Sequence, residues 1–278
     1  MSVNDLPNKI LHIKENKLID MPNEEYHSHR EYISASQIKD LLKNPYKFFH
    51  PVEQEHKKAF DTGSAIHSLL LEPENFKNEF SVAPRCDKRT KKGKEDWQKF
   101  LDESKGKIVL ESADYDNCIK IARSTLNIPE VVNLLKNGVS EKSFFITQED
   151  GTKMKVRPDR YRADINTIID VKSCRDASPD AFKRDIASYQ YYVQASYYID
   201  TLGADKFIFL AVEKTAPYMV GIYELTREDL DRGRELIKKA LATSKQPEKY
   251  TKPLYVGTNG EAVQTLTLPN YIHYDNEN

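Results

Sequence analysis

The stretch RPDRYRADINTIIDVKS, residues 157–173, places a Pro-Asp pair before a turn and an apolar strand that ends in Asp170-Val171-Lys172. Residues two apart in a strand share a face, so Asp170 and Lys172 point to one side and Ile169 and Val171 to the other. The turn at residues 163–166 would pair this strand with the segment that carries Asp159. This pairing predicts that the Asp159 carboxylate lies near Asp170.

Two neighbouring carboxylates repel each other, which raises the pKa of one of them unless a cation lies between them. Oxygen ligands of this kind suit Mg²⁺, and Mn²⁺ is the expected substitute. Lys172 could then orient a water molecule or stabilise charge on a scissile phosphate. The alternative is that Asp159 pairs with Arg157 or Arg160, and Asp170 with Lys172, as solvated ion pairs at strand ends.

The surrounding pattern predicts helices, a run of strands, one long helix, two strands and a last helix. Helices are expected at 34–44, capped by Ser34 or Ser36, at 61–73, capped by Asp61 or Thr62, at 95–106, in two pieces between 112 and 137, at 178–203, and after Thr226. Strands are expected at 107–110, three times within 141–173 in antiparallel order, and at 207–213 and 218–225. This order predicts an α/β (α+β) fold in which a mixed central sheet is flanked by helices.

Length and composition favour a single folded domain. The 278 residues carry a formal net charge of −1, so a polyanionic partner would need a locally basic surface. We expect an irregular N-terminal segment at 1–30, one domain at 31–250 and a C-terminal tail at 251–278. The absence of a membrane-spanning run or a signal peptide, together with three scattered cysteines, predicts a cytoplasmic protein without structural disulfides.

Several motifs in this order resemble the PD-(D/E)xK nuclease superfamily. Pro158-Asp159, ten further residues and Asp170-Val171-Lys172 match its signature, and GSAIHSLLLEP upstream and QASYY downstream resemble the flanking motifs of its RecE-like exonuclease branch. ISASQIKDLLKNPYKFF and KRTKKGKEDWQKF are also similar to that group, so the resemblance covers roughly residues 31–250. It implies a restriction-endonuclease-like core.

The resemblance implies that His67, Asp159 and Asp170 bind the metal and that Lys172 is the catalytic lysine. Taken alone, His67 would be read as a buried structural histidine. Glu141, at the head of a predicted strand, could add a carboxylate to the metal site or could be an exposed strand-start residue.

Gln194 and Tyr198 match the Q-x-x-x-Y motif of this branch, where such residues contact the DNA backbone or order the site. Gln190 precedes Gln194 by the same interval, which leaves an offset match open. A basic run that is a solvated loop in most proteins becomes a candidate phosphate contact in a nuclease. It comprises Lys88, Arg89, Lys91, Lys92 and Lys94.

By resemblance, the protein is expected to be a Mg²⁺-dependent exonuclease that degrades one strand of double-stranded DNA from its 5′ end. The 3′ single-stranded tails would serve recombination and repair through a RecT-like single-strand-annealing recombinase, in a bacterial or phage-infected cell. A homo-oligomeric ring is expected, a tetramer or else a trimer. The alternatives are a structure-specific or single-strand nuclease of the same fold, or a non-catalytic DNA-binding module.

Overall fold

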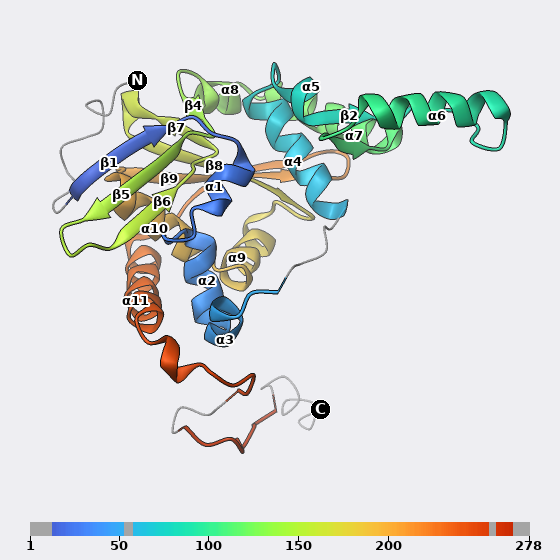
Figure 1. The fold of residues 1–278 in the computed structure, drawn as a ribbon. Coiled ribbons are helices and arrows are strands. Elements are labelled where there is room, and N and C mark those ends of the chain that lie inside the picture. The colour runs from blue at the N-terminus through green and yellow to red at the C-terminus, as the bar shows by residue number, and fades with distance from the viewer. Residues whose placement is uncertain (1–12, 53–57, 256–259, 269–278) are drawn as a thin grey trace, which may run out of the picture.

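The computed structural model describes residues 13–52, 58–255 and 260–268, and its centre is a five-stranded mixed sheet (Figure 1). The strand order is β10-β9-β8-β7-β4, and only β8 and β9 run parallel. The bounds are β4 (Val139–Ser140), β7 (Arg160–Arg162), β8 (Thr167–Cys174), β9 (Lys206–Glu213) and β10 (Val220–Glu224). The predicted α/β (α+β) class with a mixed sheet and flanking helices is therefore confirmed.

Strand β8 is buried on both faces, and its side chains alternate between two hydrophobic clusters. Ile168 packs in one cluster, and Ile169 and Val171 pack in the other. This alternation follows the two-residue period of a strand. Asp170 and Lys172 therefore project from the same face as Ile168.

Helices and a small parallel sheet cover the face that carries Ile169 and Val171. Strands β2 and β3 form this small sheet, and α4 and α7 pack against each other beside it. The bounds are α4 (Lys58–Leu71), α5 (Phe76–Glu79), β2 (Phe80–Val82), β3 (Ile108–Leu110), α7 (Ser112–Leu126) and α8 (Pro129–Leu135). The two helices predicted between 112 and 137 are confirmed. Helix α4 begins before Asp61, so the predicted caps at Asp61 and Thr62 are wrong.

The opposite face is covered by four helices and a second sheet with the strand order β1-β5-β6. The helices are α2 (Ala35–Lys43), α9 (Pro179–Ser188), α10 (Tyr191–Leu202) and α11 (Arg227–Ser244). Ser34 caps α2 by accepting a hydrogen bond from Gln37 N–H, and Thr226 caps α11 through Asp229 N–H. Asn44 ends α2 and caps the short α3 (Pro45–Phe49).

The helix predicted over 178–203 is two helices. The chain breaks between α9 and α10, where Gln190 adopts a left-handed conformation with φ of 53°. Gly203, with φ of 64°, ends α10 as predicted, because glycine adopts this conformation without a steric penalty.

The three strands predicted within 141–173 are four strands in two sheets. Strands β5 (Ser143–Gln148) and β6 (Lys153–Val156) pair with each other, and β5 also pairs with the N-terminal β1 (Ile13–Ile19). The N-terminal segment 1–30, expected to be irregular, thus contributes β1 and α1 (Asn23–Ser28), while residues 1–12 lie outside the described residues.

Helix α6 (Lys91–Glu103) extends away from the rest of the molecule (Figure 1). The spacing of Trp97, Phe100 and Leu101 in the sequence predicts that one apolar face of this helix points inward. Instead, the rings of Trp97 and Phe100 pack against each other at a tilt, outside the main clusters, and Leu101 is 39% exposed. The prediction of an inward-facing helix is therefore wrong.

After α11 the chain forms a short 3₁₀ helix, η3 (Pro247–Lys249), and residues 251–255 and 260–268 contain no helix or strand. Among the described residues, no helix is long and apolar enough to cross a lipid bilayer.

Candidate active site

Three potential metal ligands meet beside the central sheet. His67 comes from α4, Glu141 from the link between β4 and β5, and Asp159 from the segment between β6 and β7. One ligand atom from each residue lies within 4.8 Å of the other two, and His67 Nδ1 is 3.3 Å from Asp159 Oδ2. Residues from three distant parts of the sequence therefore form one cluster.

Glu141 is turned toward this cluster by its backbone. Its φ of 52° lies in the left-handed region, and its N–H donates to the carbonyl oxygens of Pro158 and Asp159. This conformation costs a non-glycine residue about 1–2 kcal/mol, and residues held in it are enriched at active sites. The backbone of Glu141 is thus slightly strained, and this conformation turns the residue toward Asp159.

The electrostatic surroundings of Glu141 favour its protonated form in the metal-free protein. Burial and then repulsion by Asp159 raise the pKa of Glu141 to about 8. The Arg157 guanidinium opposes this rise, since Arg157 Nε donates to Glu141 Oε2 at 2.9 Å. A cation between Glu141 and Asp159 would relieve the repulsion that one arginine does not cancel.

Asp170 and Lys172 form a buried ion pair next to the cluster. Asp170 is 1% exposed, and its Oδ2 lies 2.5 Å from Lys172 Nζ. Burial, with repulsion by Asp159, raises the pKa of Asp170 to about 6. Burial alone would lower the pKa of Lys172, but attraction to Asp170 and Asp159 raises it, so Lys172 carries a full charge at neutral pH.

Asp159 connects the two groups. Its Oδ2 accepts a hydrogen bond from Val171 N–H at 2.7 Å, the peptide directly after Asp170. Arg157 is paired with Glu141, and Arg160 donates to Ser140 Oγ, so neither forms the solvated pair with Asp159 that was the alternative. The Asp170 pair with Lys172 does form, but it is buried rather than solvated.

The side chains in this cluster fit a divalent cation. Asp170 Oδ2 is buried and, despite its short distance to Lys172, has no partner in hydrogen-bonding geometry. The cluster supplies carboxylate oxygens and one imidazole nitrogen, a donor set suited to Mg²⁺ or Mn²⁺. His67, Glu141 and Asp159 form the group that could hold the ion, and Asp170, predicted as a further ligand, lies next to this group.

Gln194 and Tyr198 both form hydrogen bonds within the protein near the candidate site. Gln194 Nε2 donates to Asp170 Oδ1 at 2.7 Å, which fits the site-ordering role left open for it. Tyr198 is buried, and its hydroxyl donates to the Arg157 carbonyl. This contact fits the site-ordering role for Tyr198 as well, and a DNA contact by either residue stays a prediction. Gln190 occupies the break before α10, which gives no support to the offset match.

Two residues near Asp170 were missed by sequence reasoning. Lys39, on α2, lies close enough to Lys172 and Asp170 to interact with both charges; burial and Lys172 lower its pKa. The Tyr191 ring lies 4.8 Å from Lys172 Nζ and 5.8 Å from Lys39 Nζ. The i to i+4 spacing of Lys39 and Lys43 places both on one helix face, but no local pattern places that face beside the site.

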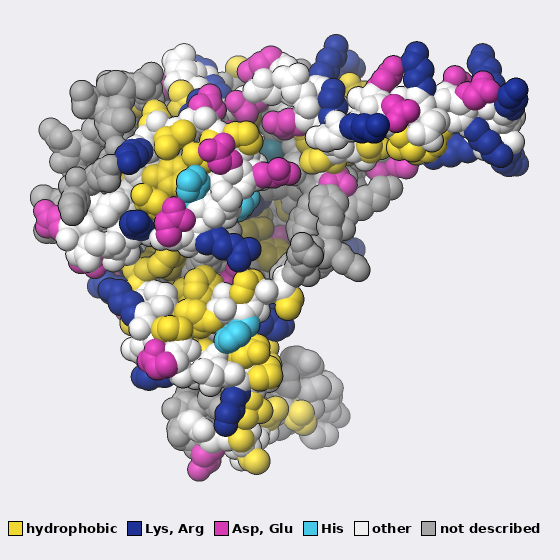
Figure 2. Space-filling model, viewed as in Figure 1, with side chains coloured by type: hydrophobic (Ala, Val, Ile, Leu, Met, Phe, Trp, Pro, Cys, Tyr) yellow, Lys and Arg dark blue, Asp and Glu magenta, His cyan; other side chains and the backbone are white. Residues whose placement is uncertain are grey.

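The basic run predicted to contact phosphate lies at the base and start of α6. Arg89 forms two hydrogen bonds with Asp87, which occupies its guanidinium. Lys91, Lys92 and Lys94 are exposed at the start of the helix. Figure 2 shows Lys and Arg side chains concentrated on this projecting arm and hydrophobic side chains along its lower edge. A DNA contact by these lysines stays a prediction.

We expect Gln194→Ala to lower the apparent metal affinity and the cleavage rate about 10- to 100-fold, the range typical of a lost second-layer hydrogen bond. Without the Gln194 amide, Asp170 Oδ1 loses the contact that orients the carboxylate. Metal titration and initial rates measure both effects. Gln98→Ala, an exposed glutamine on α6, is the control and should match the wild type; equal rates for the two variants would contradict the ordering role.

We also expect metal binding to strengthen with pH. If Glu141 is a ligand, its raised pKa of about 8 leaves about 1% of it ionised at pH 6 and about half at pH 8, so affinity should rise about 50-fold. Binding at pH 7 should therefore release protons. Isothermal titration of Mn²⁺ in buffers of different ionisation enthalpy measures this release. Glu141→Gln should flatten the pH dependence, and a flat wild-type profile would exclude Glu141 as a ligand.

Comparisons with known proteins are consistent with this arrangement. Residues 34–258 match the family described as PDDEXK-like domain of unknown function (DUF3799). Comparison with curated protein sequences finds no match. The structure of a candidate exonuclease from Eubacterium rectale is similar over 93% of this chain and 99% of its own, with 15% identity and a TM-score of 0.60.

Two further solved structures are similar at lower TM-scores. A phage-related exonuclease from Haemophilus somnus has 13% identity and a TM-score of 0.36, over 82% of this chain and 100% of its own. An alkaline exonuclease from Laribacter hongkongensis has 10% identity and a TM-score of 0.35, over 82% and 95%. The family match includes His67, Glu141, Asp159, Asp170 and Lys172.

Proposed function

Because the chain belongs to the PDDEXK-like family DUF3799, and so has the fold of PD-(D/E)xK nucleases, we propose that it is a metal-dependent exodeoxyribonuclease. The observation that carries the proposal is the cluster of His67, Glu141 and Asp159 next to the buried pair of Asp170 and Lys172. Potential metal ligands gathered beside a carboxyl group whose pKa is raised by burial and by a like charge are typical of active sites.

The side chains divide the work of phosphodiester hydrolysis. Bound Mg²⁺ would supply Lewis acidity toward the phosphate oxygens and lower the pKa of water. Lys172 is held protonated by Asp170, so it acts as a fixed positive charge toward the developing charge on the phosphate rather than as a base. Gln194 holds the Asp170 carboxylate in place, and Lys39 adds a second positive charge nearby.

An exonuclease acts only at a DNA end. The proposed function can therefore be tested by comparing DNA substrates that have ends with one that has none. The choice of an exonuclease over an endonuclease follows the resemblance to the RecE-like branch, and the Eubacterium rectale structure that shares this fold is also described as a candidate exonuclease. Linear duplex, covalently closed circular duplex and linear single strand are incubated with Mg²⁺ or with EDTA. We expect loss of the linear duplex with Mg²⁺ alone. Cleavage of the closed circle would instead indicate an endonuclease.

The finer parts of the proposal rest on the resemblance to the RecE-like branch. The enzyme would degrade the 5′-ended strand and leave 3′ tails for a RecT-like annealing recombinase, in the cytoplasm of a bacterium or of a phage-infected host. It would work as a homo-oligomeric ring, and light scattering after gel filtration measures this. A mass of four or three chains supports the ring, and a mass of one chain at micromolar concentration argues against it.

A further inference from the structure

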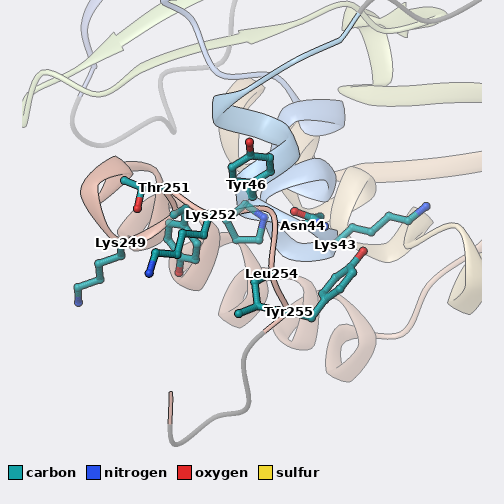
Figure 3. Close-up of a pocket in the computed structure, with 10 residues that line it drawn as sticks. Lys43, Asn44, Tyr46, Lys249, Thr251, Lys252, Leu254 and Tyr255 are labelled. Atoms are coloured by element: carbon teal, nitrogen blue, oxygen red, sulfur yellow. The ribbon is translucent and has the colours of Figure 1, made fainter. Parts of the chain in front are cut away.

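A surface groove separates the end of α2 and α3 from the segment that follows α11. It has a volume of about 350 Å³. Figure 3 shows Lys249 and Lys252 extending on one side of the groove, Lys43 on the other side, and Tyr46 and Tyr255 near it. Charged and aromatic side chains from two distant parts of the chain therefore border one surface.

The three lysines of this groove keep their positive charge unneutralised. None of the ion pairs formed among the described residues includes Lys43, Lys249 or Lys252, and no acidic residue lines the groove. Asp40 lies close enough to Lys43 to interact with its charge, but it is not part of the lining. A surface with several unpaired cations attracts an anionic partner.

The aromatic side chains of the groove offer stacking surfaces. Tyr255 is 67% exposed, so its ring is accessible to a base. Tyr46 stacks on His50 at a centroid distance of 4.2 Å, and Tyr250 stacks on Phe49 at 6.0 Å. The rings of Tyr46 and Tyr250 are therefore held in place by neighbouring aromatic rings.

Helix α2 links this groove to the candidate active site. Lys39 interacts with the charges of Lys172 and Asp170, and Lys43 lines the groove one helical turn later. The two lysines lie on the same side of α2, about 6 Å apart along its axis. A polyanion that passes the active site could therefore follow this helix face into the groove.

We propose that the groove binds single-stranded DNA, with backbone phosphates on the three lysines and bases stacked on the tyrosines. Unpaired cations combined with exposed aromatic rings are the composition of surfaces that bind single strands without reading sequence. An anionic lipid surface would use the lysines but not the stacked rings. The choice of DNA rests on the proposed exonuclease function, whose product is a single strand.

Binding is tested separately from cleavage, with a fluorescein-labelled 12-nucleotide oligothymidine in EDTA, by fluorescence anisotropy over a range of salt. The test variant carries Lys43→Glu, Lys249→Glu and Lys252→Glu. We expect its affinity to fall at least about tenfold. The slope of log affinity against log salt should become shallower by about 2, since each phosphate contact to a single strand contributes about 0.7.

The matched control reverses the same amount of charge elsewhere. Lys120→Glu, Lys183→Glu and Lys238→Glu change exposed lysines on α7, α9 and α11. This control should bind within about twofold of the wild type, since net charge alone has a small effect at physiological salt. Equal loss of affinity in both triple variants would overturn the proposal, because it would show a response to net charge rather than to the groove.

Substitutions at Tyr255 test whether bases stack on the aromatic rings of the groove. Tyr255→Ala should weaken oligonucleotide binding about 5- to 150-fold, the range measured for loss of one base-stacking ring, whereas Tyr255→Phe keeps the ring and should stay within about twofold. Equal binding by Tyr255→Ala and the wild type would overturn this role.

The two proposals can fail separately. If the wild type binds no oligothymidine, the groove proposal fails whatever the cleavage assays show. If the oligonucleotide binds and the groove variants lose it, while the wild type cleaves no DNA with Mg²⁺, the groove proposal stands and the exonuclease proposal fails.

Discussion

Lys172→Ala is expected to lower the rate of DNA cleavage on the order of 10³-fold, the loss seen when a fixed group that stabilises developing charge is removed. The substitution deletes the ammonium group that lies 2.5 Å from Asp170 Oδ2. Initial rates on linear duplex with saturating Mg²⁺ measure this loss. Lys214→Ala, an exposed lysine after β9, is the control and should keep the wild-type rate.

The same substitution leaves Asp170 buried without its partner, which typically destabilises a protein by about 3–5 kcal/mol. Thermal unfolding therefore has to accompany the rate measurement. Lys172→Arg keeps the positive charge and should unfold near the wild-type temperature, yet its larger planar group should not restore the rate. A folded Lys172→Ala protein that cleaves at the wild-type rate would contradict the role of this lysine.

Asp159→Asn is expected to abolish metal binding in the micromolar to millimolar range and to reduce cleavage on the order of 10³-fold. Asparagine has the shape of aspartate and its Oδ1 can still accept the Val171 N–H bond, so the fold should persist. The loss of negative charge should also weaken the repulsion that raises the Glu141 pKa. Addition of Mn²⁺ should raise the melting temperature of the wild type but not that of Asp159→Asn.

Asp176→Asn is the matched control for this variant. Asp176 also accepts a backbone hydrogen bond, from Ser178 N–H at 2.8 Å, but it lies at the surface away from the cluster. Its metal response and cleavage rate should equal those of the wild type. An Asp159→Asn protein that retains both properties would show that the carboxylate does not bind metal.

Local patterns were enough to predict the elements that carry most of the site. The alternation of Ile169 and Val171 with Asp170 and Lys172 indicated a strand that presents the acid and the lysine on one face, and Gly203 indicated the end of α10. Each of these signals depends only on residues that are neighbours in the chain, so it can be recognised in a single sequence. The pairing of β1 with β5 joins residues more than 120 positions apart, and no local pattern in the polar N-terminal segment reveals it.

The same limit applies to the residues of the site. Asp159 and Asp170 are joined by one short turn, so spacing could place them together. His67 was linked to them through resemblance to a family, and Glu141 only through its place at the head of a predicted strand. Tyr198 and Gln194 lie on the same helix, yet one is buried and the other reaches Asp170. Helical spacing gives the relative direction of two side chains but not the depth at which each one packs.

The position of Lys39 shows what tertiary packing adds. Helix α2 was predicted with its cap, but its contact with α10 and α11 determines which of its residues comes near Lys172. Helix α6 was also predicted from its sequence, but its packing was not. Its aromatic residues have the spacing of a core-facing helix, but the helix lies outside both main hydrophobic clusters.

The central claim is that this cluster of acids, histidine and lysine removes nucleotides from a DNA end. The most direct measurement is digestion of linear duplex DNA, labelled separately at its 5′ and 3′ ends, by the wild type with Mg²⁺ and with EDTA, beside Asp159→Asn. The proposal predicts metal-dependent release of the 5′ label as mononucleotides by the wild type alone. Intact labels in every reaction, with a folded protein that binds Mn²⁺, would contradict it.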